Sequence, residues 1–418
     1  MKSVIVCENR SKEEYSKSEL ITNRSLHKGW IHLRRRLGMD FEQLKQDVIA
    51  YSKTIGIDKI GFASASPFEE LKQRLIQQQQ LNYQSGFEEP DIEKRTNPQL
   101  LLSGAKSIIA IALAYPSKLK NAPLSKRGER RGIFCRASWG QDYHLVLRDR
   151  LQKLEAYLIE KLPDIEVKSM VDTGELSDRA VSERAGIGWS GKNCSIITPE
   201  FGSYVYLGEM ITNVPFPPDQ PIEDQCGSCT KCIDICPTGA LIQGGQLDSK
   251  KCIAFLTQTK GFLPEEYRDK IGNRIYGCDT CQTVCPKNKG MDFHNHPEME
   301  PDPELVKPLL TPLLTISNRD FKEKYGIMSG SWRGKKPLQR NAILALAHFK
   351  EASAIPDLIG VMKDDPRPVL RGTAAWALGK IGGDGVGEAI EKAMQREKDE
   401  EVLHEMNRGL ELLAQKKE

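Results

Sequence analysis

The sequence predicts a multidomain α+β protein built of an α/β domain, a bacterial-ferredoxin-like domain and a set of HEAT-like α-helical repeats. Helix and strand patterns alternate from residue 39 to about residue 215. Eight of the 11 cysteines lie between residues 226 and 285. Beyond residue 305 a helical pattern recurs after 32 residues. We therefore expect domains at 39–215, 216–300 and 301–418.

The bulk composition is that of a soluble globular protein. The hydrophobic fraction is 39% and the charged fraction is 28%. The net charge of +3 makes a global polycation impossible, so any nucleic-acid surface must be a local patch. No apolar run is long enough to span a bilayer, and no export signal is recognisable. We expect a cytoplasmic protein in a reducing compartment, where cysteines serve as metal ligands rather than as disulfides.

The amino terminus differs in character from the rest of the chain. Residues 1–38 are polar and basic, with Arg34, Arg35 and Arg36 together. Met39 is followed directly by an amphipathic helical pattern at 41–56. Our hypothesis is that Met39 is the natural start and that 1–38 is disordered or a non-native extension.

Three strands and one long helix are expected in the first domain. The apolar run at 107–115 reads as a buried strand, and the segments 165–172 and 203–212 read as two more. Residues 144–162 have the pattern of a long amphipathic helix. The alternation of the two element types favours an α/β arrangement.

The first cysteine run has the spacing of bacterial ferredoxins. It reads Cys226-x2-Cys229-x2-Cys232-x3-Cys236-Pro237. In this spacing three thiolates hold one [4Fe–4S] cluster, and the fourth cysteine ligates the other cluster. The run therefore predicts two clusters.

The second run is shorter by one cysteine. It reads Cys278-x2-Cys281-x3-Cys285-Pro286, so the two runs supply seven of the eight thiolates that two cubanes need. Cys252 lies between the runs and is the natural eighth. By ferredoxin logic the first cluster takes Cys226, Cys229, Cys232 and Cys285, and the second takes Cys236, Cys252, Cys278 and Cys281. Paired zinc sites are the alternative, because CxxC pairs also bind zinc.

The group that accepts electrons from the clusters must lie in the amino-terminal domain. The segment 171–193 holds the densest set of candidate functional residues there. Asp172 ends the expected strand at 165–172, where ligands bind in α/β folds, and it could deliver a proton. Composition alone favours a helix cap for the segment that follows. The glycine-rich stretch 185–193 lacks the order of a phosphate-binding loop. The basic turn at Lys94–Arg95 could meet an anion or be solvated, and His144 by itself is weak evidence for a metal.

The carboxy-terminal region repeats with small residues in matching places. Ala342 matches Ala374 and Leu346 matches Leu378, which indicates short helical hairpins; an ordinary helical bundle is the alternative. Basic residues gather on this region and could hold phosphates, or they could form a plain solvated surface. These residues are Arg333, Lys335, Lys336, Arg340, Arg367 and Arg371.

Together these pieces resemble the epoxyqueuosine reductase family. The resemblance rests on VDTGELSDRAVSERAGIGWSGKN, WGQDYH, CGSCTKCIDICPTGAL, YGCDTCQTVCPKN and the helical repeats. It covers residues 39–418. The longer amino terminus departs from the usual pattern of the family.

The resemblance implies the cofactors, the substrate and the reaction. Members reduce epoxyqueuosine to queuosine at the wobble position (34) of tRNA, the last step of queuosine biosynthesis, with cob(II)alamin and two [4Fe–4S] clusters. The tRNAs are those for Tyr, His, Asp and Asn, and the repeats help to grip them. A separate electron donor is implied and not identified, and we expect a monomer that does not bind a membrane.

The resemblance also assigns roles to residues of this chain. It makes Asp172 the proton donor, which reverses the preference for a cap. The candidate cobalamin contacts are Arg95, Cys135, Asp172, Asn193, Ser195, Ile196 and Ile197.

Three competing functions belong to different classes. A cobalamin-dependent, reductive dehalogenase-like oxidoreductase would be expected to carry a twin-arginine export signal and no tRNA-gripping repeats. An electron-transfer adaptor would bind no cobalamin. In a tRNA-binding scaffold the clusters would be purely structural.

Overall fold

The computed structural model describes residues 40–416, and these fall into two compact units. The described residues of the first unit are 40–115, 143–250 and 280–297. The second unit holds 116–142, 251–279 and 298–416. The units are therefore discontinuous in sequence, whereas the three expected domains are contiguous. The hypothesis about residues 1–38 lies outside the described part of the chain. No helix within 40–416 is long and apolar enough to cross a membrane.

A four-stranded sheet forms the centre of the first unit. Its order is β1 (Lys59–Ser64), β2 (Ser107–Ala114), β7 (Val205–Thr212) and β4 (Val167–Met170). Every neighbouring pair is antiparallel. The expected strands are thus present, but the α/β arrangement is wrong: the unit is α+β, because its strands alternate in direction. The rule that ligands gather at the carboxyl ends of parallel strands consequently does not apply.

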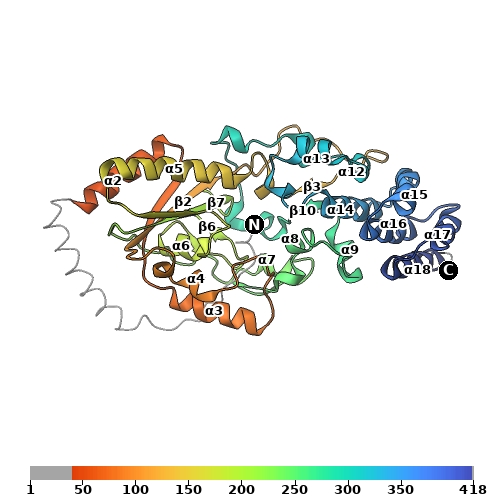
Figure 1. Cartoon of the computed structure of the whole chain (residues 1–418), viewed down its shortest axis with the longest axis horizontal. Coiled ribbons are helices and arrows are strands. Elements are labelled where there is room, and N and C mark those ends of the chain that lie inside the picture. Colours follow the sequence, from red (N-terminus) through yellow and green to blue (C-terminus); the bar gives the residue numbers. More distant parts are fainter. Residues whose placement is uncertain (1–39, 417–418) are drawn as a thin grey trace. The chain divides into compact units, whose positions relative to one another are not determined.

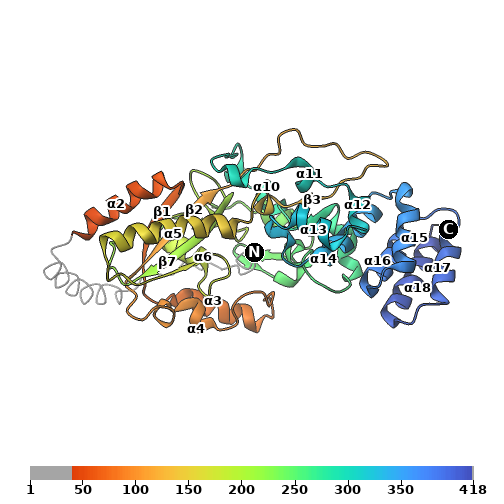
Figure 2. The same cartoon turned by 45° about the horizontal axis from the view of Figure 1, so that its top comes forward.

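Helices cover both faces of this sheet (Figures 1 and 2). One face carries α2 (Phe41–Thr54) and α5 (Tyr143–Lys161). The other carries α3 (Glu69–Gln80), α4 (Ile92–Thr96) and α6 (Asp178–Arg184). Since every residue of β2 is buried, its unbroken apolar sequence is explained by cover on both sides.

The core between the sheet and α6 contains a carboxyl group, that of Glu209, among apolar side chains. The rest of this core is built of small and branched side chains such as Ile108, Ala110, Val181 and Ile211. Glu209 on β7 pairs in register with Ala110 of β2 and is 1% exposed. A carboxyl group in such surroundings requires a specific explanation.

Shorter elements complete the first unit. A small hairpin pairs β5 with β6 in antiparallel fashion, and another pairs β8 with β9. The short helices lie in the cysteine-rich segments. These elements are β5 (Trp189–Ser190), β6 (Ile196–Ile197), α7 (Lys231–Asp234), β8 (Leu241–Gln243), β9 (Gln246–Leu247) and α10 (Thr280–Thr283).

The second unit joins a parallel pair of short strands to a helical array. The strands are β3 (Ile133–Phe134) and β10 (Arg274–Tyr276). Short helices lie between these strands and the repeats: α8 (Ile253–Leu256), α9 (Glu265–Ile271), α11 (Pro303–Val306), α12 (Leu310–Leu314) and α13 (Asn318–Tyr325).

The helical repeat that the sequence predicts is present. Leu338 lies on α14 (Lys335–His348) and its match Leu370 on α16 (Pro368–Ile381). The partner helices are α15 (Ile355–Asp364) and α17 (Val386–Met394), and α18 (Glu400–Ala414) ends the array. A methyl group on Gly379 would lie 2.4 Å from the carbonyl oxygen of Gly409, so α16 and α18 touch backbone to backbone. Close approach of helices explains the small residues in the repeat.

Candidate functional site

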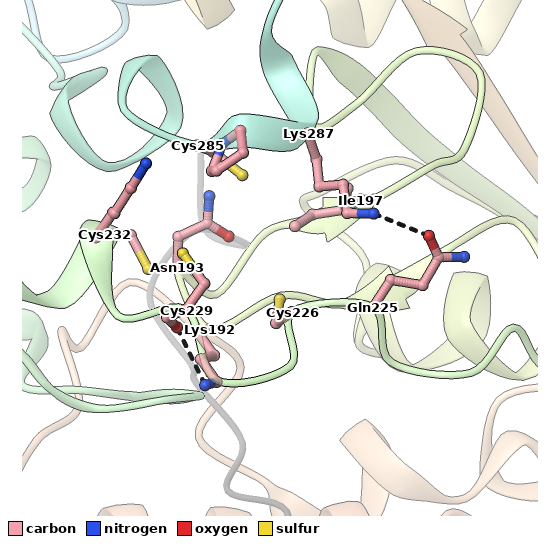
Figure 3. Close-up of a pocket in the computed structure, with 11 residues that line it drawn as sticks. Lys192, Asn193, Ile197, Gln225, Cys226, Cys229, Cys232, Cys285 and Lys287 are labelled. Atoms are coloured by element: carbon pink, nitrogen blue, oxygen red, sulfur yellow. Dashed lines mark hydrogen bonds between the residues drawn. The ribbon is translucent and has the colours of Figure 1, made fainter.

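Four cysteines of the first unit surround one cavity. Cys226, Cys229, Cys232 and Cys285 line a space of about 160 Å³ with little polar lining. Figure 3 shows their sulfur atoms turned toward this space. The structure thus brings Cys285 of the second run to the three leading cysteines of the first run, across more than fifty residues of sequence.

The spacing of these thiols suits a cluster rather than a single ion. Within residues 40–416 no three Cys, His, Asp or Glu side chains converge closely enough to hold one metal ion. A tetrahedral zinc site would need such convergence, since its Zn–S bonds are about 2.3 Å. Four thiols around a cavity instead leave room for a multi-atom cubane. Burial raises the pKa of Cys232 to about 11, with a further contribution from Cys226 and Cys285, so a bound cation is needed to stabilise the thiolate.

The loop that carries Cys226 and Cys229 is held by a lysine. Lys192 Nζ donates to the carbonyl oxygens of Gly227 (2.6 Å) and Cys229 (3.1 Å). Lys192 also lines the cavity, and its bond to Cys229 is drawn in Figure 3. These bonds satisfy carbonyl groups in a loop that has almost no regular structure of its own.

The other four expected ligands are divided between the two units. Cys236 and Cys281 belong to the first unit, whereas Cys252 and Cys278 belong to the second. All four are half-buried. Their convergence on a second cluster stays a prediction.

Asp172 sits in a strained and buried position directly after β4. Its φ of +50° lies in the left-handed region, and its side chain is 2% exposed. Tyr143 Oη donates to Asp172 Oδ2 at 2.7 Å, and His144 Nε2 lies 3.3 Å from the same oxygen. The backbone N–H of Asp172 donates to Oδ2 of Asp178 at 2.9 Å. Strain of this kind gathers at functional sites. The cap interpretation is wrong, because the N-cap of α6 is Ser177.

Two further carboxyl groups lie buried behind Asp172. Burial and the neighbouring charge of Asp172 raise the pKa of Asp178 to about 6. Burial and the charge of Asp178 raise the pKa of Glu209 well above its ordinary value. Burial thus favours the neutral form of Glu209. The pKa of Asp172 is instead lowered well below its ordinary value: burial raises it, whereas the hydrogen bonds from His144 and Tyr143 lower it.

The expected cobalamin contacts fall into three groups. Arg95 and Asp172 line one small cavity together. Asn193 and Ile197 line the cysteine cavity, with Ser195 and Ile196 in the same short hairpin. Cys135 belongs to the second unit, where it is buried against Gly277: a methyl group there would lie 2.2 Å from its Sγ.

Three of the six expected tRNA contacts, Arg340, Arg367 and Arg371, are buried or paired with carboxylates of the chain. Arg340 is 1% exposed and donates to the carbonyl oxygens of Leu256, Thr259 and Gly261. Because no donor of Arg340 reaches the surface, we correct its assignment: it is a structural clamp. Arg367 is paired with Asp365 at 2.7 Å and Arg371 with Glu397 at 2.7 Å.

The other three lie beside an exposed aromatic side chain. Trp332 is 49% exposed, and the guanidinium of Arg333 lies 4.7 Å from its ring centroid. Lys335 begins α14 and donates to the carbonyl oxygen of Ile316, and Lys336 follows it. Stacking surface beside positive charge is a combination that binds nucleic acid.

Sequence reasoning missed several residues of the site. Tyr143 and Asp178 lie within motifs that carry the family resemblance, but nothing in their spacing predicts a role for either residue. Glu209 carried a usable signal, because an acidic residue interrupts an expected strand that is otherwise largely apolar. Trp189 carried no such signal in the sequence, since a tryptophan in a short hairpin usually packs in the core.

Family models match three segments of the chain. Residues 95–173 match the family described as epoxyqueuosine reductase QueG, DUF1730. Residues 225–288 match a 4Fe-4S double cluster binding domain, and residues 334–411 match HEAT repeats. The expected multidomain α+β organisation is confirmed at this level.

Relatives match the chain over nearly its whole length. An epoxyqueuosine reductase of Bacillus cereus is 99% identical over 380 residues, which are 91% of this chain and 100% of that protein. The Bacillus subtilis enzyme is 70% identical over 90% of this chain and 97% of its own length.

Solved structures match as well. An epoxyqueuosine reductase bound to an epoxyqueuosine-modified tRNA-Tyr stem loop is 70% identical, with a TM-score of 0.89 over 90% of this chain and 100% of that one. A further structure, from Bacillus subtilis, is described with its catalytic aspartate loop swung out of the active site (69% identity, TM-score 0.88, 90% of this chain and 100% of that one). On these grounds, the chain belongs to the epoxyqueuosine reductase family.

Proposed function

We propose that this protein reduces epoxyqueuosine to queuosine at position 34 of tRNA, in the tRNAs for Tyr, His, Asp and Asn. The observation that carries the proposal is the placement of Asp172, a strained acid in the loop between β4 and α6. A relative is described with a catalytic aspartate on a loop, and the loop of Asp172 has the bonds needed to hold such a group in place.

The reaction consumes two electrons and two protons, because the epoxide oxygen leaves as water. Cobalamin and the [4Fe–4S] clusters, when bound, supply a strong cobalt nucleophile and electrons delivered one at a time. The cavity lined by Cys226, Cys229, Cys232 and Cys285 fits a cluster in size and donor chemistry. We assign four residues to the side facing cobalamin. Arg95 and Asp172 line one cavity, and Asn193 and Ile197 line the other.

Asp172 is the group that we assign to protonation of the leaving oxygen. Burial raises the pKa of Asp172 and the hydrogen bonds from His144 and Tyr143 lower it; because this pKa lies well below its ordinary value, Asp172 must receive the proton that it passes on. Tyr143 and His144 meet Oδ2, which fixes the plane of the carboxyl group. His144 has a side-chain exposure of 16% and can return a proton to Oδ2 from the solvent side.

The tRNA would be held by a basic surface on the second unit. Arg333, Lys335 and Lys336 form the best candidate because they lie beside the exposed Trp332, although Arg333 donates to the carbonyl oxygen of Gln258 and Lys335 to that of Ile316. Such contacts to phosphate weaken as the salt concentration rises.

A reconstituted assay tests the reaction. The clusters are reconstituted without oxygen, cobalamin and a strong reductant are added, and tRNA from cells that lack the activity is the substrate. Mass spectrometry of digested nucleosides then follows the loss of one oxygen from epoxyqueuosine. We expect conversion that requires cobalamin. Asp172→Asn should keep cobalamin bound and lower the rate by about 10²–10⁴-fold, the usual contribution of a general acid.

The negative outcomes point to different functions. Full loading with cobalamin and clusters but no conversion would favour another cobalamin-dependent reduction. No binding of cobalamin at all would favour an electron-transfer adaptor.

A further inference from the structure

Two buried N–H donors beside the cysteine cavity have no oxygen or nitrogen partner within residues 40–416. They are Nε1 of Trp189, a residue that is 1% exposed, and Nδ2 of Asn193, which is 6% exposed. A buried donor without a partner costs about 1–3 kcal/mol. Such a cost persists in a folded protein when the donor has a use.

Both donors are aimed by the short hairpin of β5 and β6. Trp189 lies on β5 opposite Ile197 of β6. The Oδ1 of Asn193 accepts from the backbone N–H of Ser195 at 3.2 Å, which fixes the orientation of the amide. Nδ2 is thereby directed away from that bond, and Figure 3 shows the amide among the four cysteines.

Independent contacts place the indole of Trp189 at the same cavity. Lys287, which lines the cavity, holds its ammonium group 5.6 Å from the centroid of the Trp189 ring. The indole N–H of Trp189 and the backbone N–H of Lys192 both face the sulfur of Cys226.

The cavity beside these donors is lined by four cysteine sulfur atoms, which can accept their hydrogen bonds. The thiolates and sulfides of a [4Fe–4S] cluster accept N–H hydrogen bonds, and these bonds help to set its reduction potential. Reduction adds one negative charge to the cluster. A donor that points at sulfur stabilises the more negative state and makes the cluster easier to reduce.

We propose that Trp189 and Asn193 donate hydrogen bonds to the cluster held by Cys226, Cys229, Cys232 and Cys285 and raise its reduction potential. This inference rests on the proposed function for the presence of that cluster. Trp189 and Asn193 are positioning residues in this role, since they act through the cluster and not on the substrate. They allow the protein to accept electrons from a weaker reductant.

The test is an anaerobic redox titration of the fully reconstituted, cobalamin-loaded protein, followed by electron paramagnetic resonance. Trp189→Phe removes the indole N–H and keeps an aromatic ring. We expect the ratio of reduced to oxidised cluster at a fixed potential to fall about tenfold for one cluster, a shift of about 59 mV for one electron. Trp376→Phe is the matched control, because Trp376 is a 2% exposed tryptophan on α16 of the second unit, and it should leave both potentials unchanged.

A second readout detects the bond itself. In protein refolded and reconstituted in heavy water, electron–nuclear double resonance of the reduced cluster should show an exchangeable-hydrogen coupling that disappears in Trp189→Phe. If Trp189→Phe does not retain iron, Asn193→Ser provides the same comparison through Nδ2. Unchanged potentials and couplings in a fully loaded variant would overturn the inference, as would an equal shift in Trp376→Phe. Loss of epoxyqueuosine reduction by the unmodified protein would instead overturn the proposed function.

Discussion

Replacing Asp178 with asparagine should stabilise the protein in a pH-dependent manner. The variant keeps an oxygen that accepts from the backbone N–H of Asp172, but it removes the buried charge. The pKa of Asp178 is raised from 3.8 to about 6. This difference of about 2 units corresponds to about 3 kcal/mol, at 1.36 kcal/mol for each unit.

The direction in which stability changes with pH follows from which state, folded or unfolded, binds the proton of Asp178 more tightly. The folded protein holds the proton at Asp178 more tightly than the unfolded chain. The stabilisation that this proton gives the unmodified protein is therefore complete below about pH 4. It is lost as the pH rises through about 6. The neutral asparagine has no such loss, so its advantage over aspartate should grow between pH 4 and 6 and then level off.

Anaerobic thermal denaturation of the loaded protein measures this advantage. For a unit of this size, about 1 kcal/mol corresponds to about 2–4 °C in melting temperature. We expect the melting temperature of Asp178→Asn minus that of the unmodified protein to rise by several degrees from pH 4.5 to 7. Asp164→Asn, at an exposed turn, should give a flat difference. A flat difference for Asp178→Asn as well would refute the raised pKa of Asp178.

Three other substitutions test the second unit. Glu405→Gln should lower the unfolding free energy by about 3–5 kcal/mol in thermal denaturation, because it leaves the buried guanidinium of Arg268 without its paired carboxylate; equal stability would contradict this. Arg340→Met should also destabilise the protein while leaving the salt dependence of tRNA binding unchanged, and a weaker salt dependence would return Arg340 to the tRNA surface. Lys336→Glu should leave the melting temperature unchanged and weaken tRNA binding, with the slope of log K against log salt reduced by about 1 or more in filter binding. An unaltered slope would exclude Lys336 from the interface.

Local patterns in the sequence were sufficient for much of the fold. The unbroken apolar run at 107–115 predicts β2 because a strand covered on both faces has no polar side. The 32-residue repeat predicts α14 and α16 because helix packing demands small residues at fixed intervals. Strand direction, by contrast, depends on long-range pairing. The antiparallel sheet could therefore not be read from the order of elements.

The candidate site was predictable only where the spacing of residues in the sequence indicates their chemistry. The cysteine runs predict a cluster because three thiolates a few residues apart can hold one cubane, and the same pattern takes the fourth ligand, Cys285, from the distant second run. The roles of Asp178 and Glu209 depend on burial, and burial of a carboxyl group shows only when the strands and α6 are in place. The same holds for Arg340, whose charge suggests a surface until its exposure is known.

The interleaving of the two compact units has a consequence for biosynthesis. The chain passes between them after residues 115, 142, 250, 279 and 297, so the first unit cannot close before residue 297 has left the ribosome. Translation proceeds at about 5–20 residues per second, and the interval from Cys226 to Cys285 therefore leaves thiols unligated for roughly 3–12 s in the nascent chain. Long-range contacts of this kind also slow folding. We expect cluster insertion to follow release of the chain from the ribosome. We also expect shortened chains that end before the repeats to be bound by chaperones rather than to fold into an active fragment.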